Sequence, residues 1–208
     1  MEEIITSVTV CLVTLFPLLN PLGAIPLFCS LTANETNEYR KTEARKTAMN
    51  VFFILLVFLL IGKLLLALFG ISIAVLKIAG GLIVAHTAWE MVTGKQKLTQ
   101  AESDEVTTKQ DISFTPMAMP LLSGPGSIGA VIGLNTKASI QSLDDIIGYI
   151  IGIIILCLII YLTLIVSIKL FKFLGTTGIG VLNRMMGFFI LAIAVEMIYQ
   201  GFLALKLF

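Results

Sequence analysis

The sequence predicts an all-α, polytopic membrane protein with six transmembrane segments. Of the 208 residues, 57% are hydrophobic and 13% are charged, whereas a soluble domain carries about a quarter charged residues. No charged residue occurs within residues 4–34, 112–136 or 146–168, and about 20 apolar residues in a helix cross the hydrocarbon core of a bilayer. The apolar runs are continuous rather than alternating, which excludes a transmembrane β-barrel.

The six segments follow from the apolar runs and from the polar residues between them. Residues 34–46 separate the first two segments, residues 70–72 form a tight turn, a polar loop at 95–111 divides the chain in half, and residues 174–178 separate the last two. None of these connections is long enough for an extramembrane domain, so residues 1–208 are predicted to form one membrane domain. The segments cover residues 4–32, 47–69, 71–94, 113–134, 146–170 and 179–205.

The distribution of Lys and Arg predicts the orientation of the chain, because basic residues are enriched in cytoplasmic loops. With the N-terminus outside, ten basic residues face the cytoplasm and four face outward. Both termini are therefore expected to be extracytoplasmic. The ten are Arg40, Lys41, Arg45, Lys46, Lys95, Lys97, Lys109, Lys169, Lys172 and Arg184, and the four are Lys63, Lys77, Lys137 and Lys206.

An internal duplication organises the sequence. Residues 17–26 (PLLNPLGAIP) align without gaps with residues 120–129 (PLLSGPGSIG), and five of the ten positions are identical. Residues 73–94 align in turn with residues 179–200, which pairs Gly81 with Gly187, Ala88 with Ala194 and Glu90 with Glu196. Repeat one covers about 1–97 and repeat two about 110–208. Because each repeat has three segments, an odd number, the two are predicted to lie inverted in the bilayer, as in many secondary transporters.

Proline and glycine are predicted to break the first and fourth segments midway. Proline removes a backbone donor and disrupts a helix, and irregular backbone at this depth is tolerated where it is buried in protein or lines a watery cavity. Breaks at corresponding positions of two repeats indicate a transport site, although kinks that serve packing alone are the alternative. The two clusters are Pro17, Pro21, Gly23 and Pro26, and Pro120, Gly124, Pro125, Gly126 and Gly129.

The predicted substrate site consists of the residues at these two breaks. Asn20 is expected to cap a restarted helix with Pro21 at its first position, and Ser123 to cap the second restart with Pro125 in its first turn. The free N–H groups and the positive end of each helix dipole would bind a carboxylate. An ammonium group would donate hydrogen bonds to carbonyls left free at the breaks and to Asn20, Ser123 or Thr115. The site residues are Asn20, Pro21, Gly23, Ser123, Gly124, Pro125 and Gly126.

Three further polar residues in the apolar segments are candidates for coupling or gating. Glu90 and Glu196 are equivalent in the two repeats, and intramembrane carboxylates often mark relays, but an interfacial anchor or a structural pair is the alternative. His86 lies one helical turn before Glu90. No further ligands of comparable quality accompany this pair, so no metal site is expected.

The runs Asn-Pro-Leu-Gly at 20–23 followed by Pro26, and Pro-Leu-Leu-Ser-Gly-Pro-Gly at 120–126, together with the six-segment plan, resemble the MarC/SnatA family. The resemblance covers essentially the whole chain. It implies a bacterial or archaeal inner-membrane protein of 3+3 inverted topology. It also implies transport of small neutral amino acids such as alanine, glycine or serine, with export as the expected direction.

Other function classes find less support in the sequence. A net charge of +1 leaves no basic surface for nucleic acid. Neither an HExxH nor a GxSxG motif occurs, and one histidine is few for haem or quinone chemistry, so neither an enzyme nor a cofactor is expected. The prediction is a secondary transporter that works by alternating access in the lipid bilayer. The alternatives are a channel or passive facilitator and a membrane protein without transport activity. Small-residue faces at Gly81, Ala85 and Ala88 and at Gly148 and Gly152 suit close helix packing, within the chain or in a homo-oligomer.

Overall fold

The computed structural model describes residues 1–94, 111–134 and 143–205, and within them the chain is helical and contains no strand. Five helices are long and apolar enough to cross a membrane, or six spans if the bent η1–α6 pair counts as one. The all-α, polytopic prediction is thus confirmed. The elements are α1 (Glu2–Leu19), α2 (Ile25–Leu31), α3 (Asn37–Leu68), α4 (Ile73–Thr93), the π-helical η1 (Ser113–Leu122), α6 (Pro125–Leu134) and α7 (Leu143–Ala204).

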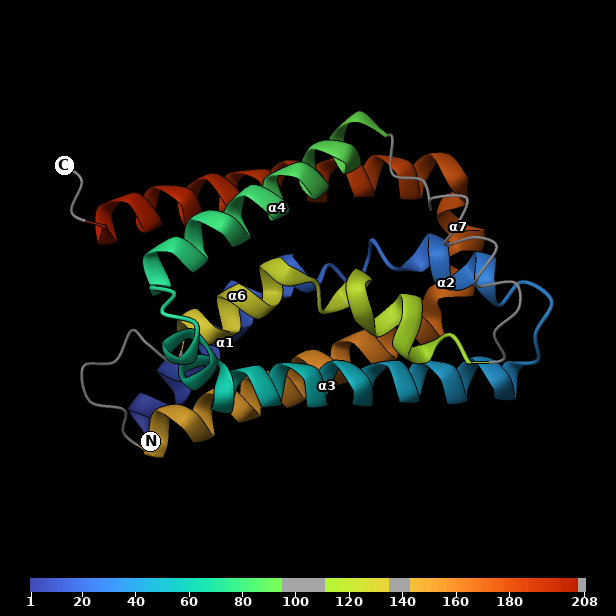
Figure 1. The fold of residues 1–208 in the computed structure, drawn as a ribbon. Coiled ribbons are helices and arrows are strands. Elements are labelled where there is room, and N and C mark those ends of the chain that lie inside the picture. The colour runs from blue at the N-terminus through green and yellow to red at the C-terminus, as the bar shows by residue number, and fades with distance from the viewer. Residues whose placement is uncertain (95–110, 135–142, 206–208) are drawn as a thin grey trace.

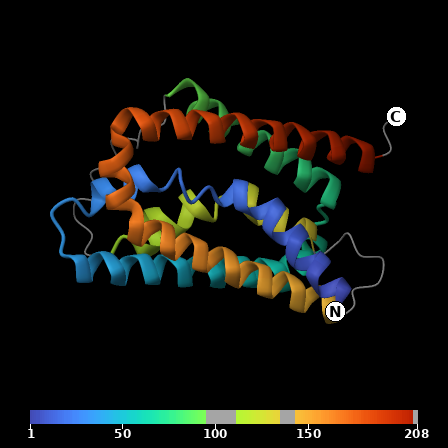
Figure 2. The same ribbon diagram turned by 180° about the vertical axis from the view of Figure 1, so that it is seen from behind.

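The helices lie lengthwise in one bundle (Figure 1). The connection between α2 and α3, the end of α4 and a bend in α7 lie at one end of the bundle, which we call the α2–α3 end. The N-terminus, the turn between α3 and α4 and the last turns of α7 lie at the opposite, N-terminal end. Thus α1, α4 and the first part of α7 run toward the α2–α3 end, whereas α3, η1–α6 and the last part of α7 run away from it (Figure 2).

Two helices extend beyond the predicted apolar segments. Helix α3 begins at Asn37, ten residues before the predicted start at 47, because the Thr36 hydroxyl accepts a hydrogen bond from the Tyr39 N–H (3.2 Å) and caps the helix. Helix α7 contains both the fifth and the sixth predicted segments. Its bend lies at Gly175 (φ 64°, ψ 179°), inside the predicted connection 174–178. A positive φ of this kind favours glycine. The polar loop 95–111, apart from Asp111, lies outside the described residues.

The first segment is broken, as predicted, but the prediction for Asn20 is wrong in its details. Asn20 has φ 42° and ends α1, and its N–H donates to the Phe16 carbonyl (3.1 Å). Helix α2 restarts only at Ile25, with Pro26 rather than Pro21 in its first turn. Asparagine tolerates the left-handed conformation, so Asn20 terminates the preceding helix and a turn precedes the restart.

The fourth segment is also broken, and its two parts, η1 and α6, meet at an angle of 65°. Helix α6 begins at Pro125, so this residue lies in the first turn, as predicted. The prediction that Ser123 caps this helix is wrong. The Ser123 N–H instead closes η1 on the Ala118 carbonyl (2.7 Å), and its hydroxyl finds no hydrogen-bond partner among the described residues. The first hydrogen bond of α6 runs from the Ile128 N–H to the Gly124 carbonyl (3.1 Å).

The apolar residues form two separate cores. The larger core joins α1, α2, α3, η1, α6 and the first part of α7. The smaller core joins α4 to the last part of α7 through Val84, Ala88, Met91, Ile190 and Ala194. Many large apolar side chains on the outer faces stay exposed, including Leu64 on α3 and Leu158 on α7, as suits a protein surrounded by lipid.

Glycines bring the paired helices close together, and repeat-equivalent residues make matching contacts. A Cβ atom on Gly81 would lie 2.9 Å from the Ala194 carbonyl oxygen, and one on Gly187 would lie 3.1 Å from the Ala88 carbonyl oxygen. Gly148 allows a similar approach of the first part of α7 to α1, where its Cβ would lie 2.9 Å from the Ile4 carbonyl oxygen. Both predicted small-residue faces are therefore used within the chain.

Candidate functional site

Both helix breaks line a single cavity of about 780 Å³. Its remaining walls come from α4 and from the last part of α7, so the cavity lies between the two apolar cores. The breaks contribute Asn20, Gly23, Pro26, Pro120, Gly124, Pro125, Gly126 and Ser127; α4 contributes Val84, Thr87, Glu90, Met91 and Gly94; and α7 contributes Gly180, Asn183, Arg184 and Ile190.

The structure brings together five of the seven predicted site residues. Pro21 and Ser123 do not line the cavity, since both are buried in the packed protein around the breaks. Of the three coupling candidates, Glu90 lines the cavity, whereas His86 and Glu196 do not. The His86 side chain is 75% exposed, and its Nε2 atom lies 4.0 Å from the Oε1 atom of Glu90. The exposed Glu196 accepts a hydrogen bond from Gln200 (2.8 Å).

The second break offers unpaired backbone donors to the cavity. Among the described residues, no acceptor is found for the N–H groups of Gly126 and Ser127, which belong to the first turn of α6 and line the cavity. The Ser127 hydroxyl donates backward to the Gly124 carbonyl (2.9 Å). Free N–H groups at a helix N-terminus, together with the helix dipole, attract an anion.

The first break differs from the second at Gly23, which lines the cavity. The Gly23 N–H is already shared between the Asn20 carbonyl (3.0 Å) and the Asn20 Oδ1 (3.2 Å). The Asn20 Nδ2 contacts the Met91 sulfur on α4 at 3.6 Å. In addition, α2 has only seven residues. The two half-helix ends are therefore not equivalent. At the second break the N–H groups of Gly126 and Ser127 face the cavity, whereas at the first break Asn20 occupies the Gly23 N–H and contacts α4.

Glycine at position 126 allows α6 to approach α4. A Cβ atom at Gly126 would overlap the Val84 Cγ2 atom, so any other residue would push the two helices apart. Val84 is buried and belongs to the cavity wall. The contact therefore holds the N-terminus of α6 against α4 at the cavity.

The cavity extends toward the α2–α3 end of the bundle. Gly94 ends α4, and Gly180 and Arg184 lie shortly after the α7 bend, all at this end. Toward the N-terminal end, α3 packs closely on α6, where a Cβ on Gly62 would lie 2.9 Å from the Ile132 Cδ1. Leu59, Leu66 and Ile132 are buried there. The larger core is therefore closely packed on that side.

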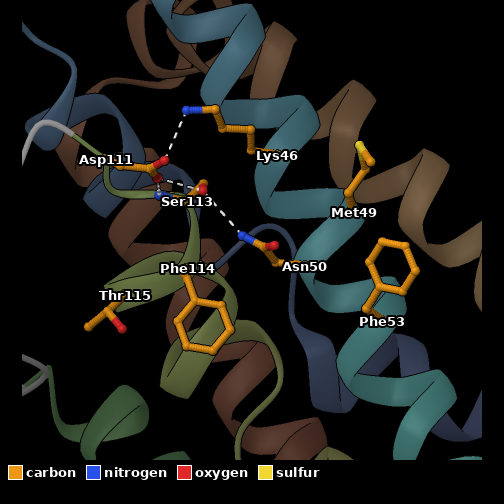
Figure 3. Close-up of a pocket in the computed structure, with 8 residues that line it drawn as sticks. All are labelled: Lys46, Met49, Asn50, Phe53, Asp111, Ser113, Phe114 and Thr115. Carbon is orange, nitrogen blue, oxygen red and sulfur yellow. Dashed lines mark hydrogen bonds and ion pairs between the residues drawn. The ribbon is translucent and has the colours of Figure 1, made fainter.

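A second cavity, of about 500 Å³, lies between α3 and the start of η1 (Figure 3). Lys46 bridges the Glu43 and Asp111 carboxylates (3.0 and 2.9 Å). Asp111 Oδ1 accepts from the N–H and the hydroxyl of Ser113 (2.9 and 2.6 Å), and Asn50 donates to the same hydroxyl (3.2 Å). The hydrogen bonds from Ser113 and Lys46 hold the pKa of Asp111 below its usual range.

This network was missed in the sequence because its members come from two distant segments. Glu43, Lys46 and Asn50 do follow the i, i+3, i+7 spacing of one helix face, which was the available signal. Glu43 is 1% exposed, and its Oε2 accepts from the Ile112 N–H (3.1 Å). Since the carboxylates are paired with Lys46 and with backbone or hydroxyl donors, the network anchors the start of η1 to α3.

Comparisons with known proteins place the chain in a family. Residues 5–205 match the family described as "MarC family integral membrane protein". The chain is 38% identical to UPF0056 membrane protein MJ1677 of Methanocaldococcus jannaschii, over 90% of this chain and 92% of the relative. It is 35% identical to UPF0056 membrane protein YvbG of Bacillus subtilis (91% and 90%) and 34% identical to UPF0056 membrane protein YhcE of Escherichia coli (90% and 87%).

No solved structure matches the chain. The family match covers nearly all of the sequence, including both helix breaks and every element that lines the cavity. The protein belongs to the MarC family of integral membrane proteins.

Proposed function

We propose that this protein is a secondary transporter that exports small neutral amino acids, such as alanine, glycine or serine, by alternating access. The observation that carries the proposal is the cavity that both helix breaks line. In this proposal the protein is not an enzyme, it lies in the inner (plasma) membrane and its termini are extracytoplasmic. The cavity then faces the cytoplasm, where an exporter collects its substrate.

Two features support an inverted-repeat arrangement. The three segments of repeat one run opposite to their counterparts in repeat two (Figure 1). The contacts between α4 and the last part of α7 are also reciprocal, since Gly81 meets Ala194 and Gly187 meets Ala88, and each residue of one contact is the repeat equivalent of a residue in the other. Reciprocal contacts are what a pseudo-two-fold axis produces.

The chemistry of the cavity suits an amino acid carboxylate. The free N–H groups of Gly126 and Ser127 at the start of α6 would donate to its oxygens, without the cost of burying a cationic side chain. The cavity volume of about 780 Å³ accommodates a small solute with water. The substrate name itself rests on the family resemblance.

Alternating access requires two bodies and a hinge between them. The two separate cores supply the bodies. Among the described residues, α4 and the last part of α7 join the larger body at Gly70 (φ 65°) and Gly175 (φ 64°). A Cβ at either glycine would meet no described atom within 4 Å. Rocking about these two glycines would close the α2–α3 end and open the other.

The test is uptake and counterflow of labelled alanine in proteoliposomes. A carrier gives saturable flux and accelerated exchange with alanine on the opposite side, whereas a channel gives flux proportional to concentration and no exchange. Gly126→Leu should abolish the flux while the variant still inserts in the membrane, because the new side chain would clash with Val84 and push α6 away from α4. The absence of flux for alanine, glycine and serine in the wild type would refute the proposal, and wild-type flux in Gly126→Leu would refute the site.

A further inference from the structure

Two side chains of opposite charge line the cavity near its α2–α3 end without pairing with each other. Glu90 lies in the last turn of α4, and Arg184 lies on the last part of α7. Among the described residues, the Glu90 side chain has one charged partner, His86, at 4.0 Å, and Arg184 forms no ion pair or hydrogen bond. Ionisable residues within membrane segments are costly and usually serve a function.

A buried acceptor lies beside them. The Oδ1 atom of Asn183 has no hydrogen-bond partner within the described residues, although it is shielded from solvent and its residue lines the same cavity. Buried polar atoms almost always find a partner, because leaving one unpaired is expensive. Asn183 therefore requires a donor that the described part of the chain does not supply.

The three residues lie at the same level of the cavity. A Cβ atom on Gly94 would lie 3.3 Å from Arg184 Nη2, so the guanidinium lies beside the end of α4. Glu90 precedes Gly94 by one helical turn, and its carbonyl accepts the Gly94 N–H that closes α4. Asn183 directly precedes Arg184 in the sequence.

Glu90 and Arg184 are poorly placed to act as a gate that closes by pairing. Both belong to the body formed by α4 and the last part of α7, and these helices are locked together at Gly187, whose Cβ would lie 2.8 Å from the Met91 Cβ. A rocking motion moves this body as a unit, so it does not change the separation of the two charges. Within the described part of the chain, the two charges remain available to a ligand.

We propose that Arg184, Glu90 and Asn183 form a recognition site for the zwitterionic backbone of an amino acid at the mouth of the cavity. The guanidinium of Arg184 binds the carboxylate, and the Glu90 carboxylate and the Asn183 Oδ1 accept from the ammonium group. The inference rests on the proposed transport function and extends it to the step before the substrate reaches α6. A fixed pair of opposite charges selects ligands that carry both charges over simple acids and simple amines.

The test is ligand binding by the full-length protein in lipid nanodiscs, measured by calorimetry with alanine, propionate and ethylamine. Arg184→Gln should weaken alanine and propionate binding by about tenfold to a hundredfold, the range for hydrogen bonds to charged groups. Glu90→Gln should weaken alanine binding to a similar extent and leave propionate binding unchanged. Arg184→Lys should recover part of the loss, because it restores the charge without the forked geometry.

Arg45→Gln and Glu38→Gln are matched controls, since both residues are exposed on α3 and neither lines the cavity. Unchanged alanine affinity in both Arg184→Gln and Glu90→Gln would overturn the inference. It would also be overturned if Glu90→Gln weakened propionate binding as much as alanine binding. If Arg184→Gln does not fold, Glu90→Gln and Asn183→Leu decide the question. If the wild type transports alanine but all these variants bind it with normal affinity, only the recognition site is refuted. If the wild type shows no alanine flux, the proposed transport function is refuted.

Discussion

Gly126→Ala tests whether the contact between α6 and α4 shapes the cavity. The added methyl group overlaps the Val84 Cγ2 atom, and Val84 is only 7% exposed. Alanine in place of glycine favours the helix by about 1 kcal/mol, but overpacking costs about 1–3 kcal/mol. We therefore expect a net loss of up to about 2 kcal/mol in the free energy of unfolding, together with slower alanine transport.

A second substitution separates this clash from other effects. Val84→Ala alone removes two buried methyl groups and should cost about 2 kcal/mol, counted at about 0.8 kcal/mol for each group plus the cavity that remains. In the double variant the two changes compensate, because the space vacated at Val84 accepts the new methyl group at Gly126. The loss in the free energy of unfolding of the double variant should therefore be smaller than the sum of the two single losses, by at least about 0.5 kcal/mol.

The assay is urea unfolding of the purified protein in detergent, paired with alanine uptake in proteoliposomes. Gly133→Ala in the same helix is the control, since a Cβ at Gly133 would meet no described atom within 4 Å. If the two single losses simply add in the double variant, the contact with Val84 is not what makes glycine necessary at this position. Uptake that recovers together with stability would tie the transport defect to the same contact.

Three further predictions follow from the described contacts. Gly81→Ala and Gly187→Ala should each destabilise the protein by about 1–3 kcal/mol in urea unfolding, because each new Cβ meets a backbone carbonyl across the α4–α7 contact; unchanged stability in both would contradict the close packing. Glu43→Ala should cost about 1–3 kcal/mol, since it leaves the Ile112 N–H unpaired, and an equal loss in the exposed control Glu38→Ala would count against this explanation. The pKa of Asp111 is lowered from 3.8 by Ser113 and Lys46, so its stabilising contribution is present above about pH 4 and is lost as the pH falls below that value. The difference in melting temperature between wild type and Asp111→Asn should therefore shrink from pH 7 to pH 3. A difference that stays constant would refute this assignment.

The positions of the breaks follow from local sequence, although their geometry does not. Proline and glycine interrupt a helix through their own backbone chemistry, so the interruptions near Asn20 and Ser123 could be predicted. Whether Asn20 ends one helix or begins the next depends on the path of the chain beyond it. Asn20 ends α1 with a left-handed backbone, whereas Ser123 ends η1 and leaves its hydroxyl buried.

The sequence by itself determined that this chain lies in a membrane as a set of helices with two interrupted segments. The reason is local: charge-free runs of sufficient length must satisfy their backbone hydrogen bonds internally in lipid. Only the tertiary structure decided which side chains share the cavity. It placed Asn183 and Arg184 of the second repeat beside Glu90 of the first and excluded Ser123 and Glu196. The rotation of each helix about its axis and the pairing of distant segments depend on how glycine and larger side chains interlock, and no single segment contains that information.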